Sequence, residues 1–203
     1  MGARFSALLM VLENEGQCMG NTGANQYFIY ALEGPSSILL DDRRHRLEPG
    51  GYVYLPPGKD VQIKSGGPAS RILIFQTRYQ PLPGVSRPPA FVNHQRDVKA
   101  EPLQENDAVQ CQVLMPEDPA FDLSVNLFKF QPGATWKSVR AHTMETGLVM
   151  LRGHGLFRLN TEWLPVRAGD ILWVAPFCPQ WFAAVGNAPA CYISCQDVNR
   201  DPM

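Results

Sequence analysis

The chain has 203 residues, which is the length of one large domain or of two domains of about 100 residues each. Its 45% hydrophobic and 18% charged residues are typical of a globular protein, and no apolar stretch approaches the ~18 residues of a membrane-spanning helix. The 18 basic and 19 acidic residues give a net charge of −1 without a block of like charge, which argues against a nucleic-acid partner.

Short runs typical of β-strands recur along the whole chain. They are rich in β-branched and aromatic residues, are bounded by Gly, Pro, Asn and Asp, and cover residues 28–32, 52–55, 71–75, 125–130 and 170–174. Helical periodicity is absent from every stretch of useful length. The 17 glycines and 18 prolines add frequent turns, so the pattern predicts an all-β sandwich or barrel.

An internal repeat with an offset of 119 residues relates the two halves. It is marked by three pairs of turn residues, which are Gly34 and Gly153, Gly50 and Gly169, and Pro57 and Pro176. Between the copies, residues 79–89 contain four prolines, which cannot donate to a sheet ladder and therefore predict an extended connector. We place the boundary near residue 95, with a first domain at 1–95 and a second at 96–203.

The cysteines and the start of the chain indicate the compartment. The five cysteines are odd in number, widely spread and without a C-x-x-C pair, unlike a secreted disulfide framework. The start Met-Gly-Ala-Arg-Phe lacks the apolar core and cleavage site of a secretory signal. We therefore expect a cytoplasmic protein without a membrane partner.

The second half carries a series of more specific motifs. They are GHGLFRL at 153–159, WLPV at 163–166, AGD at 168–170, APFCPQW at 175–181 and DVNRDP at 197–202, with RYQPLPG at 78–84 in the connector. By these motifs the chain resembles the (S)-ureidoglycine aminohydrolases, which are bicupin enzymes of allantoin breakdown. The resemblance implies two tandem cupin jelly-roll β-barrels. It also implies a segment before the Met-Gly-Ala-Arg-Phe stretch, so we expect the first barrel to be truncated at its start.

The resemblance implies a site for Mn²⁺ or another divalent metal, built as Glu-x-His-x-x-x-His with a later Gln. In this sequence the pattern falls on Arg140, His142, Thr146 and Gln180. Arginine has no lone pair to offer a cation, and the Thr146 hydroxyl is at best a weak ligand. The metal ligands are therefore reduced to His142 and Gln180, and a barrel without metal is the alternative.

Three further positions of the family pattern have counterparts here. A family lysine is replaced by Gln196 and a family tyrosine by Phe157, whereas Tyr192 is kept. The resemblance assigns catalytic roles to the positions of Tyr192 and Gln196. Substrate binding falls on Phe157, Gln180 and Arg140.

Arg140 has two possible roles. Its guanidinium replaces the cation of the metal site and binds the carboxylate of a small ligand through two hydrogen bonds. Alternatively, it turns outward to solvent or pairs with Glu145.

The positions in the first half that lie 119 residues earlier are Asn21, Gly23, Tyr27 and Val61. They are not a usual set of metal ligands. We therefore expect the first barrel to be a structural or oligomerisation module.

Several functions are compatible with these residues. The first is the metal-assisted release of ammonia from ureidoglycine to give ureidoglycolate, which makes the protein a hydrolase of a linear C–N bond. The alternative is a catalytically degenerate, metal-free cupin that binds a small carboxylate or ureido compound, and a third is an enzyme repurposed for another small-molecule reaction. In each case the partner is a small molecule, and exposed sheet edges predict a homo-oligomer.

Overall fold

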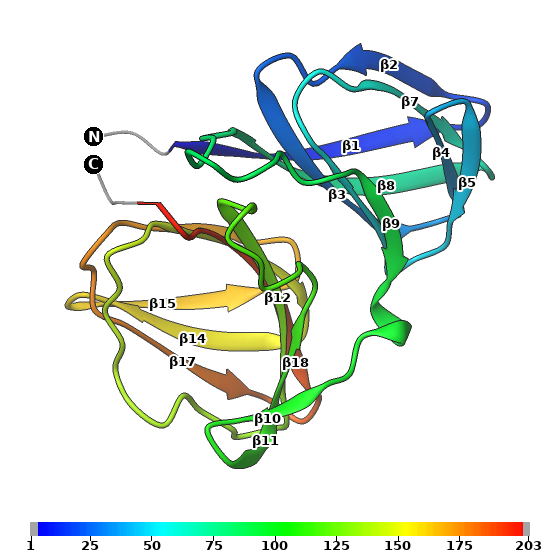
Figure 1. Ribbon diagram of the computed structural model, residues 1–203. Coiled ribbons are helices and arrows are strands. Elements are labelled where there is room, and N and C mark those ends of the chain that lie inside the picture. Colours follow the sequence, from blue (N-terminus) through cyan, green and yellow to red (C-terminus); the bar gives the residue numbers. More distant parts are fainter. Residues whose placement is uncertain (1–3, 201–203) are drawn as a thin grey trace. The chain divides into compact units, whose positions relative to one another are not determined.

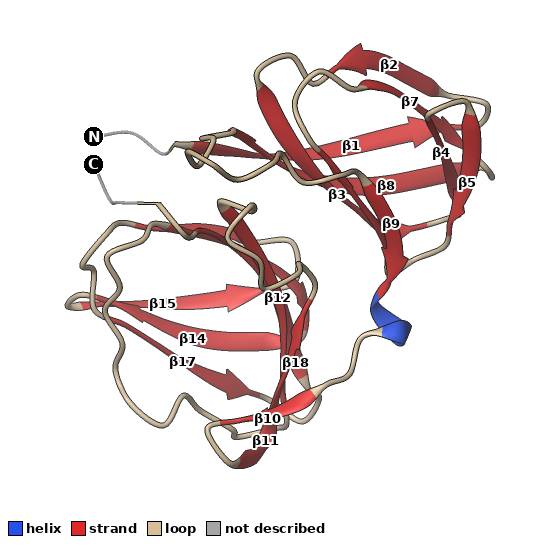
Figure 2. Ribbon diagram, in the orientation of Figure 1, coloured by secondary structure: helices blue, strands red, loops and turns tan. Residues whose placement is uncertain are grey.

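The computed structural model describes residues 4–200, and almost all of its regular structure is strand (Figures 1 and 2). The chain divides into two compact units, residues 1–97 and 98–203, whereas the expected boundary lies near residue 95. A short 3₁₀ turn, Gln95–Asp97, ends the first unit. Within residues 4–200 no helix is long and apolar enough to cross a membrane. The expectations about Met1, and the last residues of the closing motif, Asp201 and Pro202, lie outside the described part.

Unit 1 consists of two antiparallel sheets. The five-stranded sheet has the order β1 (Phe5–Glu13), β8 (Ala69–Arg78), β3 (Asn25–Glu33), β6 (Gly51–Leu55) and β9 (Phe91–His94). The four-stranded sheet has the order β2 (Gln17–Asn21), β7 (Asp60–Ser65), β4 (Ser36–Leu40) and β5 (Arg43–Leu47). Ile29 and Val53 from the first sheet pack with Ile38 and Ile63 from the second, so the core lies between the two sheets.

Unit 2 repeats this plan. Its six-stranded sheet has the order β10 (Glu101–Leu103), β11 (Asn106–Val113), β12 (Leu123–Phe130), β18 (Ala190–Asp197), β13 (Thr146–Arg152) and β16 (Ile171–Val174). The three-stranded sheet has the order β15 (Glu162–Arg167), β14 (His154–Leu159) and β17 (Gln180–Val185). The core between them is aromatic, with Phe130, Phe157 and Phe182 buried against Tyr192.

The prediction of an all-β fold is confirmed. Four predicted runs lie wholly in strands, namely 28–32 in β3, 52–55 in β6, 71–75 in β8 and 125–130 in β12. The fifth, 170–174, lies in β16 except for Asp170, which precedes that strand. The β-branched and aromatic residues of these runs fit strands that are covered on one or both faces, which is why local composition was a sufficient guide.

The offset of 119 residues recurs in the three-dimensional structure. The ladder β3–β8 shifts register between Ala31 and Glu33, and the ladder β13–β18 shifts between Met150 and Arg152. Directly after each shift, Gly34 and Gly153 adopt positive φ values of 68° and 74°. A Cβ atom at Gly34 would lie 2.0 Å from a backbone oxygen, and one at Gly153 would lie 2.6 Å from another. Both turns therefore require glycine for its conformation and for its lack of a side chain.

Candidate functional site

The inner face of unit 2 follows from strand alternation along β12, β18 and β13. Side chains two residues apart point to the same side of a strand, and directly paired residues share a face. Phe128 pairs with Tyr192, while Leu148 pairs with Ser194, and Thr146 with Gln196. The inner face is therefore aromatic along one stretch and becomes polar along the next.

A cavity of about 50 Å³ opens at this polar stretch, which is room for about three or four water molecules. Six of the residues singled out from the sequence line it, namely Arg140, His142, Thr146, Gln180, Tyr192 and Gln196. The other lining residues are Phe128, Trp136, Leu148 and Ser194.

The loop between β12 and β13 carries Arg140 and His142 into the cavity and is held by backbone hydrogen bonds. The N–H of Arg140 donates to the Gln180 carbonyl at 2.9 Å, and the N–H of Gln180 donates to the Arg140 carbonyl at 2.7 Å. The N–H of Phe177 donates to the carbonyl of His142 at 2.6 Å. These bonds attach a segment without regular structure to β17 and to the turn before it.

Arg140 is half-buried against an aromatic ring. Its Cζ lies 3.8 Å from the ring centroid of Trp136, which is a close cation–π contact. Burial lowers the pKa of the guanidinium, while Tyr192 and Cys111 act in the opposite direction. Within residues 4–200 the Arg140 side chain has no carboxylate partner. Glu145, the partner considered from the sequence, instead accepts a hydrogen bond from Trp173 Nε1 at 3.1 Å.

His142 and Tyr192 are both held in their neutral forms. Burial, followed by the charge of Arg140, lowers the pKa of His142 below its usual 6.5, so the imidazole is neutral at pH 7. Burial also raises the pKa of Tyr192 well above 10, although a hydrogen bond with the Trp136 side chain and the charge of Arg140 oppose this. The cavity therefore contains one cation beside uncharged groups that can donate or accept protons.

Thr146 and Gln196 are hydrogen-bonded to each other. The Nε2 of Gln196 donates to the Oγ1 of Thr146 at 2.8 Å across the β13–β18 ladder. Both positions thus contribute neutral hydrogen-bonding groups to the wall of the cavity.

Phe157, expected at the substrate, is placed differently. Its side chain is 1% exposed and does not line the cavity. The ring packs with centroids 5.0 Å from Phe182 and 5.9 Å from Tyr192. Phe157 therefore supports Tyr192 from within the core and does not reach a ligand in the cavity.

Sequence reasoning missed three polar or aromatic members of the lining, namely Phe128, Trp136 and Ser194. Phe128 pairs with Tyr192 in the β12–β18 ladder. Trp136 lies in the loop between β12 and β13, outside every predicted strand, and no local pattern brings it to Arg140. Ser194 could have been found, because it lies two residues from both Tyr192 and Gln196 on one strand and must share their face.

The donor set does not fit a divalent metal. It offers the His142 imidazole, the Gln180 amide and the Thr146 hydroxyl, which already accepts from Gln196. Of the residues that the structure describes, none lines the cavity with a carboxylate. The guanidinium of Arg140 does line it and would repel a cation. Among residues 4–200 no group of three or more His, Cys, Asp and Glu side chains could hold a metal ion.

The equivalent positions of unit 1 form a different interior. Tyr27 and Val61, which correspond to Thr146 and Gln180 in the 119-residue frame, pack against the apolar core. Asn21, at the position of Arg140, donates through Nδ2 to Asp60 at 2.6 Å on the exposed side.

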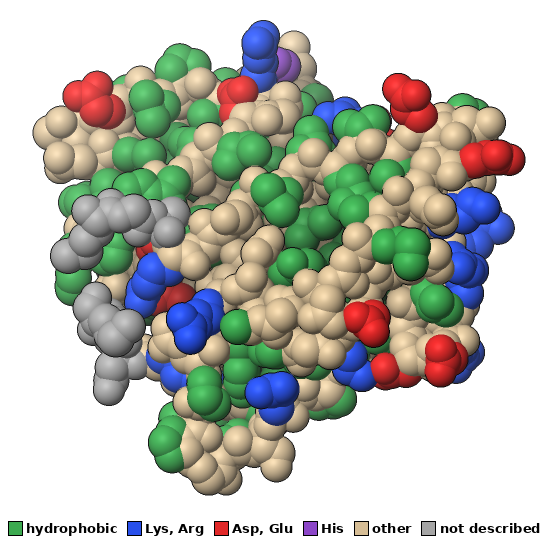
Figure 3. Space-filling view, turned by 90° about the horizontal axis from the view of Figure 1, so that it is seen from above, with side chains coloured by type: hydrophobic (Ala, Val, Ile, Leu, Met, Phe, Trp, Pro, Cys, Tyr) green, Lys and Arg blue, Asp and Glu red, His purple; other side chains and the backbone are tan. Residues whose placement is uncertain are grey.

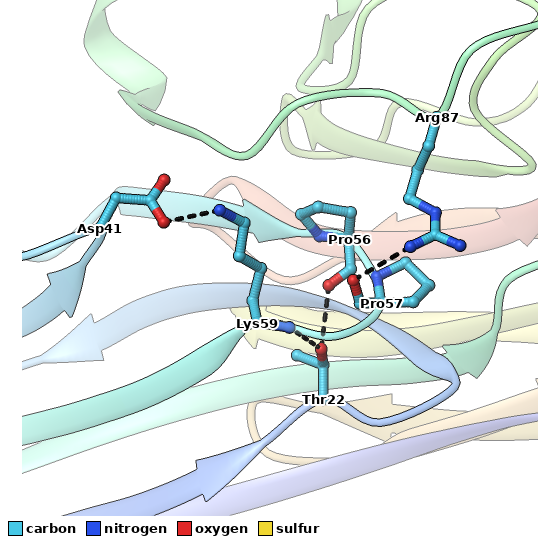
Figure 4. Close-up of polar contacts among 6 residues, drawn as sticks. All are labelled: Thr22, Asp41, Pro56, Pro57, Lys59 and Arg87. Atoms are coloured by element: carbon cyan, nitrogen blue, oxygen red, sulfur yellow. Dashed lines mark hydrogen bonds and ion pairs between the residues drawn. The ribbon is translucent and has the colours of Figure 1, made fainter.

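The turns at this end of unit 1 are joined by Thr22 (Figure 4). Its Oγ1 donates to the Pro56 carbonyl at 2.9 Å and accepts from the Lys59 N–H at 2.8 Å. Lys59 also forms an ion pair with Asp41, with an Nζ–Oδ1 distance of 2.6 Å. Unit 1 thus has polar contacts between its turns at the end that corresponds to the cavity of unit 2.

Comparisons with known proteins agree with this architecture. A family model of the cupin domain matches residues 126–195. Among solved structures, the putative glyoxylate induced protein from Pseudomonas aeruginosa is 29% identical with a TM-score of 0.90, covering 98% of this chain and 76% of that one. Protein Ylba from E. coli is 25% identical with a TM-score of 0.87, covering 99% of this chain and 80% of that one.

Curated relatives extend the similarity along the chain. A probable (S)-ureidoglycine aminohydrolase of Oryza sativa subsp. japonica is 31% identical, covering 100% of this chain and 65% of the rice protein. The (S)-ureidoglycine aminohydrolase of Arabidopsis thaliana is 32% identical over 86% of this chain and 58% of its own length. The (S)-ureidoglycine aminohydrolase of Escherichia coli (strain K12) is 28% identical, covering 99% of this chain and 78% of the E. coli protein. The chain thus spans less than two thirds of the rice and Arabidopsis proteins.

Proposed function

The chain is a relative of the (S)-ureidoglycine aminohydrolases within the cupin superfamily, and on this premise we propose that its second unit releases ammonia from a small ureido carboxylate such as ureidoglycine. The convergence of His142, Gln180 and Tyr192 on one cavity carries the proposal. These are the positions in which the resemblance and this sequence agree.

The chemistry uses groups that are neutral at pH 7. The C–N bond to the amino group breaks, and the amine leaves as ammonia together with the ureido N–H proton. The oxygen of a water molecule then bonds to the same carbon, and one proton of that water molecule is transferred to the ureido nitrogen. The imidazole of His142 carries the proton between these positions, because a neutral ring has both a donor and an acceptor nitrogen.

Gln180 and Tyr192 orient the substrate. The amide of Gln180 can both donate to and accept from a ureido group, which has the same pair of functions. The hydroxyl of Tyr192 stays protonated and donates a hydrogen bond into the cavity.

The test is ammonia release from freshly generated ureidoglycine, measured above the spontaneous rate and with or without added Mn²⁺. We expect release by the wild-type protein, and a loss of about 100-fold or more for His142→Ala. His154→Ala is the matched control, because His154 is an exposed histidine of the same unit, and it should keep full activity. A wild-type rate equal to the blank under both conditions would remove the proposal.

A second candidate function is binding without turnover. It is favoured by Arg140, Thr146 and Gln196, which stand where the family pattern has two metal ligands and a lysine. In that case the same cavity retains a small carboxylate or ureido compound, and no ammonia appears in the assay.

Unit 1 has a structural and oligomerisation role in this proposal, and the protein acts in the cytoplasm as a homo-oligomer. The support is its apolar interior and its edge strand β1, on which Leu8, Leu9 and Val11 are 46%, 49% and 56% exposed. Figure 3 shows hydrophobic side chains exposed on one face of the chain, with charged side chains scattered among them.

A further inference from the structure

We propose that Arg140 is a built-in cation that binds the carboxylate of a small monocarboxylate ligand in place of a divalent metal. This inference deepens the proposed function and rests on it, because it concerns the same cavity. It explains why the donor set is poor for a metal, since the positive charge that a metal would supply is already part of the chain.

The charge of Arg140 is not compensated by the protein. Within residues 4–200 its side chain makes no ion pair or hydrogen bond, and its Cζ lies 3.8 Å from the centroid of the Trp136 ring. Its other neighbours, Tyr192 and Cys111, are uncharged at pH 7, because burial raises the pKa of Cys111 to about 11 and that of Tyr192 well above 10. A half-buried cation without an anionic partner is unfavourable, so an anion that enters the cavity gains both the Coulomb attraction and the unused donors.

The guanidinium is held in place before a ligand arrives. The paired backbone hydrogen bonds with Gln180 fix the main chain of Arg140, and the Trp136 ring supports its side chain. The N–H donors of a guanidinium lie in its own plane and match the two oxygens of a carboxylate. Little conformational entropy is then lost when a carboxylate binds.

The remaining lining specifies a neutral second end for the ligand. Gln180, Ser194 and His142 offer hydrogen-bonding groups that are not carboxylates. The side-chain amide of Gln180 has an acceptor for ligand N–H groups, and a single carboxylate suffices to balance a single cation. The ligand class is therefore a small monocarboxylate with an amide or ureido end.

The experiment uses ureidoacetate, a ureido carboxylate without an amino group to release, and ureidoacetamide, which has a similar shape and no charge. Binding to the full chain is measured by titration calorimetry after exhaustive dialysis against a chelator. We expect ureidoacetate to bind without metal, and ureidoacetamide to bind about tenfold more weakly or worse. Arg140→Gln should remove that preference, and Arg140→Lys should keep part of it. Arg167→Gln, at an exposed arginine of the same unit, should leave it unchanged.

Each other outcome has a defined meaning. The inference is overturned if ureidoacetate does not bind, if it binds only after Mn²⁺ is added, or if both probes bind equally. It is also overturned if Arg140→Gln keeps the preference. Should Arg140→Gln fail to fold by near-UV circular dichroism, Arg140→Met, which also lacks the charge, is measured in its place with the same expectation. Binding of ureidoacetate without ammonia release from ureidoglycine would remove the proposed enzyme and keep the Arg140 site. Ammonia release that is insensitive to Arg140→Gln would remove the Arg140 site and keep the proposed enzyme.

Discussion

At the scale of single residues, the site depends on what surrounds each polar group. Arg140 contacts the Trp136 ring and has no carboxylate partner in the described part of the chain, and the Thr146 hydroxyl accepts a hydrogen bond from Gln196. The chemistry available to these residues thus follows from their neighbours as much as from their own type.

Trp136 should control the affinity of the Arg140 site. We expect Trp136→Ala to weaken binding of ureidoacetate by about two- to thirtyfold, because a cation–π contact of about 0.5–2 kcal/mol is lost. Trp136→Phe keeps a ring under the guanidinium and should retain most of the affinity. Calorimetric titration measures both variants, and equal losses in the two would show that the ring does not support Arg140.

The metal site should be recoverable by three substitutions. Arg140→Glu and Thr146→His add an anionic oxygen and a second imidazole to His142 and Gln180, and Gln196→Lys adds the family lysine. We expect the triple variant to retain about one Mn²⁺ per chain after dialysis, measured by elemental analysis, and to release ammonia faster than wild type. Arg140→Leu alone removes the repelling charge without adding a ligand atom and should retain no metal. A folded triple variant without Mn²⁺ would contradict this prediction.

At the scale of elements, turns with glycine at positive φ set the frame in which the site is built. Gly153 lies between β13 and β14, and Gly169 lies between β15 and β16, with φ values of 74° and 95°. They differ in their surroundings, because a Cβ at Gly153 would meet the Pro189 carbonyl whereas nothing lies within 4 Å of one at Gly169.

Replacing each of these two glycines by alanine should therefore lower the free energy of unfolding by different amounts. Gly169→Ala pays only for the left-handed conformation, about 1–2 kcal/mol of unfolding free energy. Gly153→Ala also forces backbone atoms apart, and we expect a total loss of about 3 kcal/mol or more. Urea denaturation monitored by tryptophan fluorescence measures both, and similar losses would show that the turn after β13 can relax.

At the scale of the whole molecule, two units of one architecture differ in the polarity of the residues at one end of their cores. At matching positions unit 1 has Tyr27 and Val61 against an apolar core, whereas unit 2 has Thr146 and Gln180 at a cavity. A duplicated sandwich can keep its sheets and turns while the residues at one end change from polar to apolar, because the rest of the core provides the stability.

The edge strand β1 should mediate self-association. We expect sedimentation velocity to show a species larger than the 22.6 kDa chain, and Leu9→Lys to shift it toward the monomer, because a lysine on an edge strand opposes pairing with another chain. Met19→Lys, at an exposed position of β2, is the control and should leave the distribution unchanged. A wild-type monomer at micromolar concentration would rule out the homo-oligomer.

The sequence by itself determined the strand runs, the turn glycines and the 119-residue frame, because alternation, β propensity and positive φ are properties of short segments. The resemblance to the aminohydrolases led to Arg140, His142 and Gln180, and the 119-residue frame then placed their counterparts in the first half. Only the tertiary structure decided that Trp136 supports Arg140, that Phe157 lies behind Tyr192 and that Thr146 meets Gln196. Those contacts join segments that are distant in the chain or lie in an irregular loop, where antiparallel pairing and core packing, and no local pattern, set the neighbours.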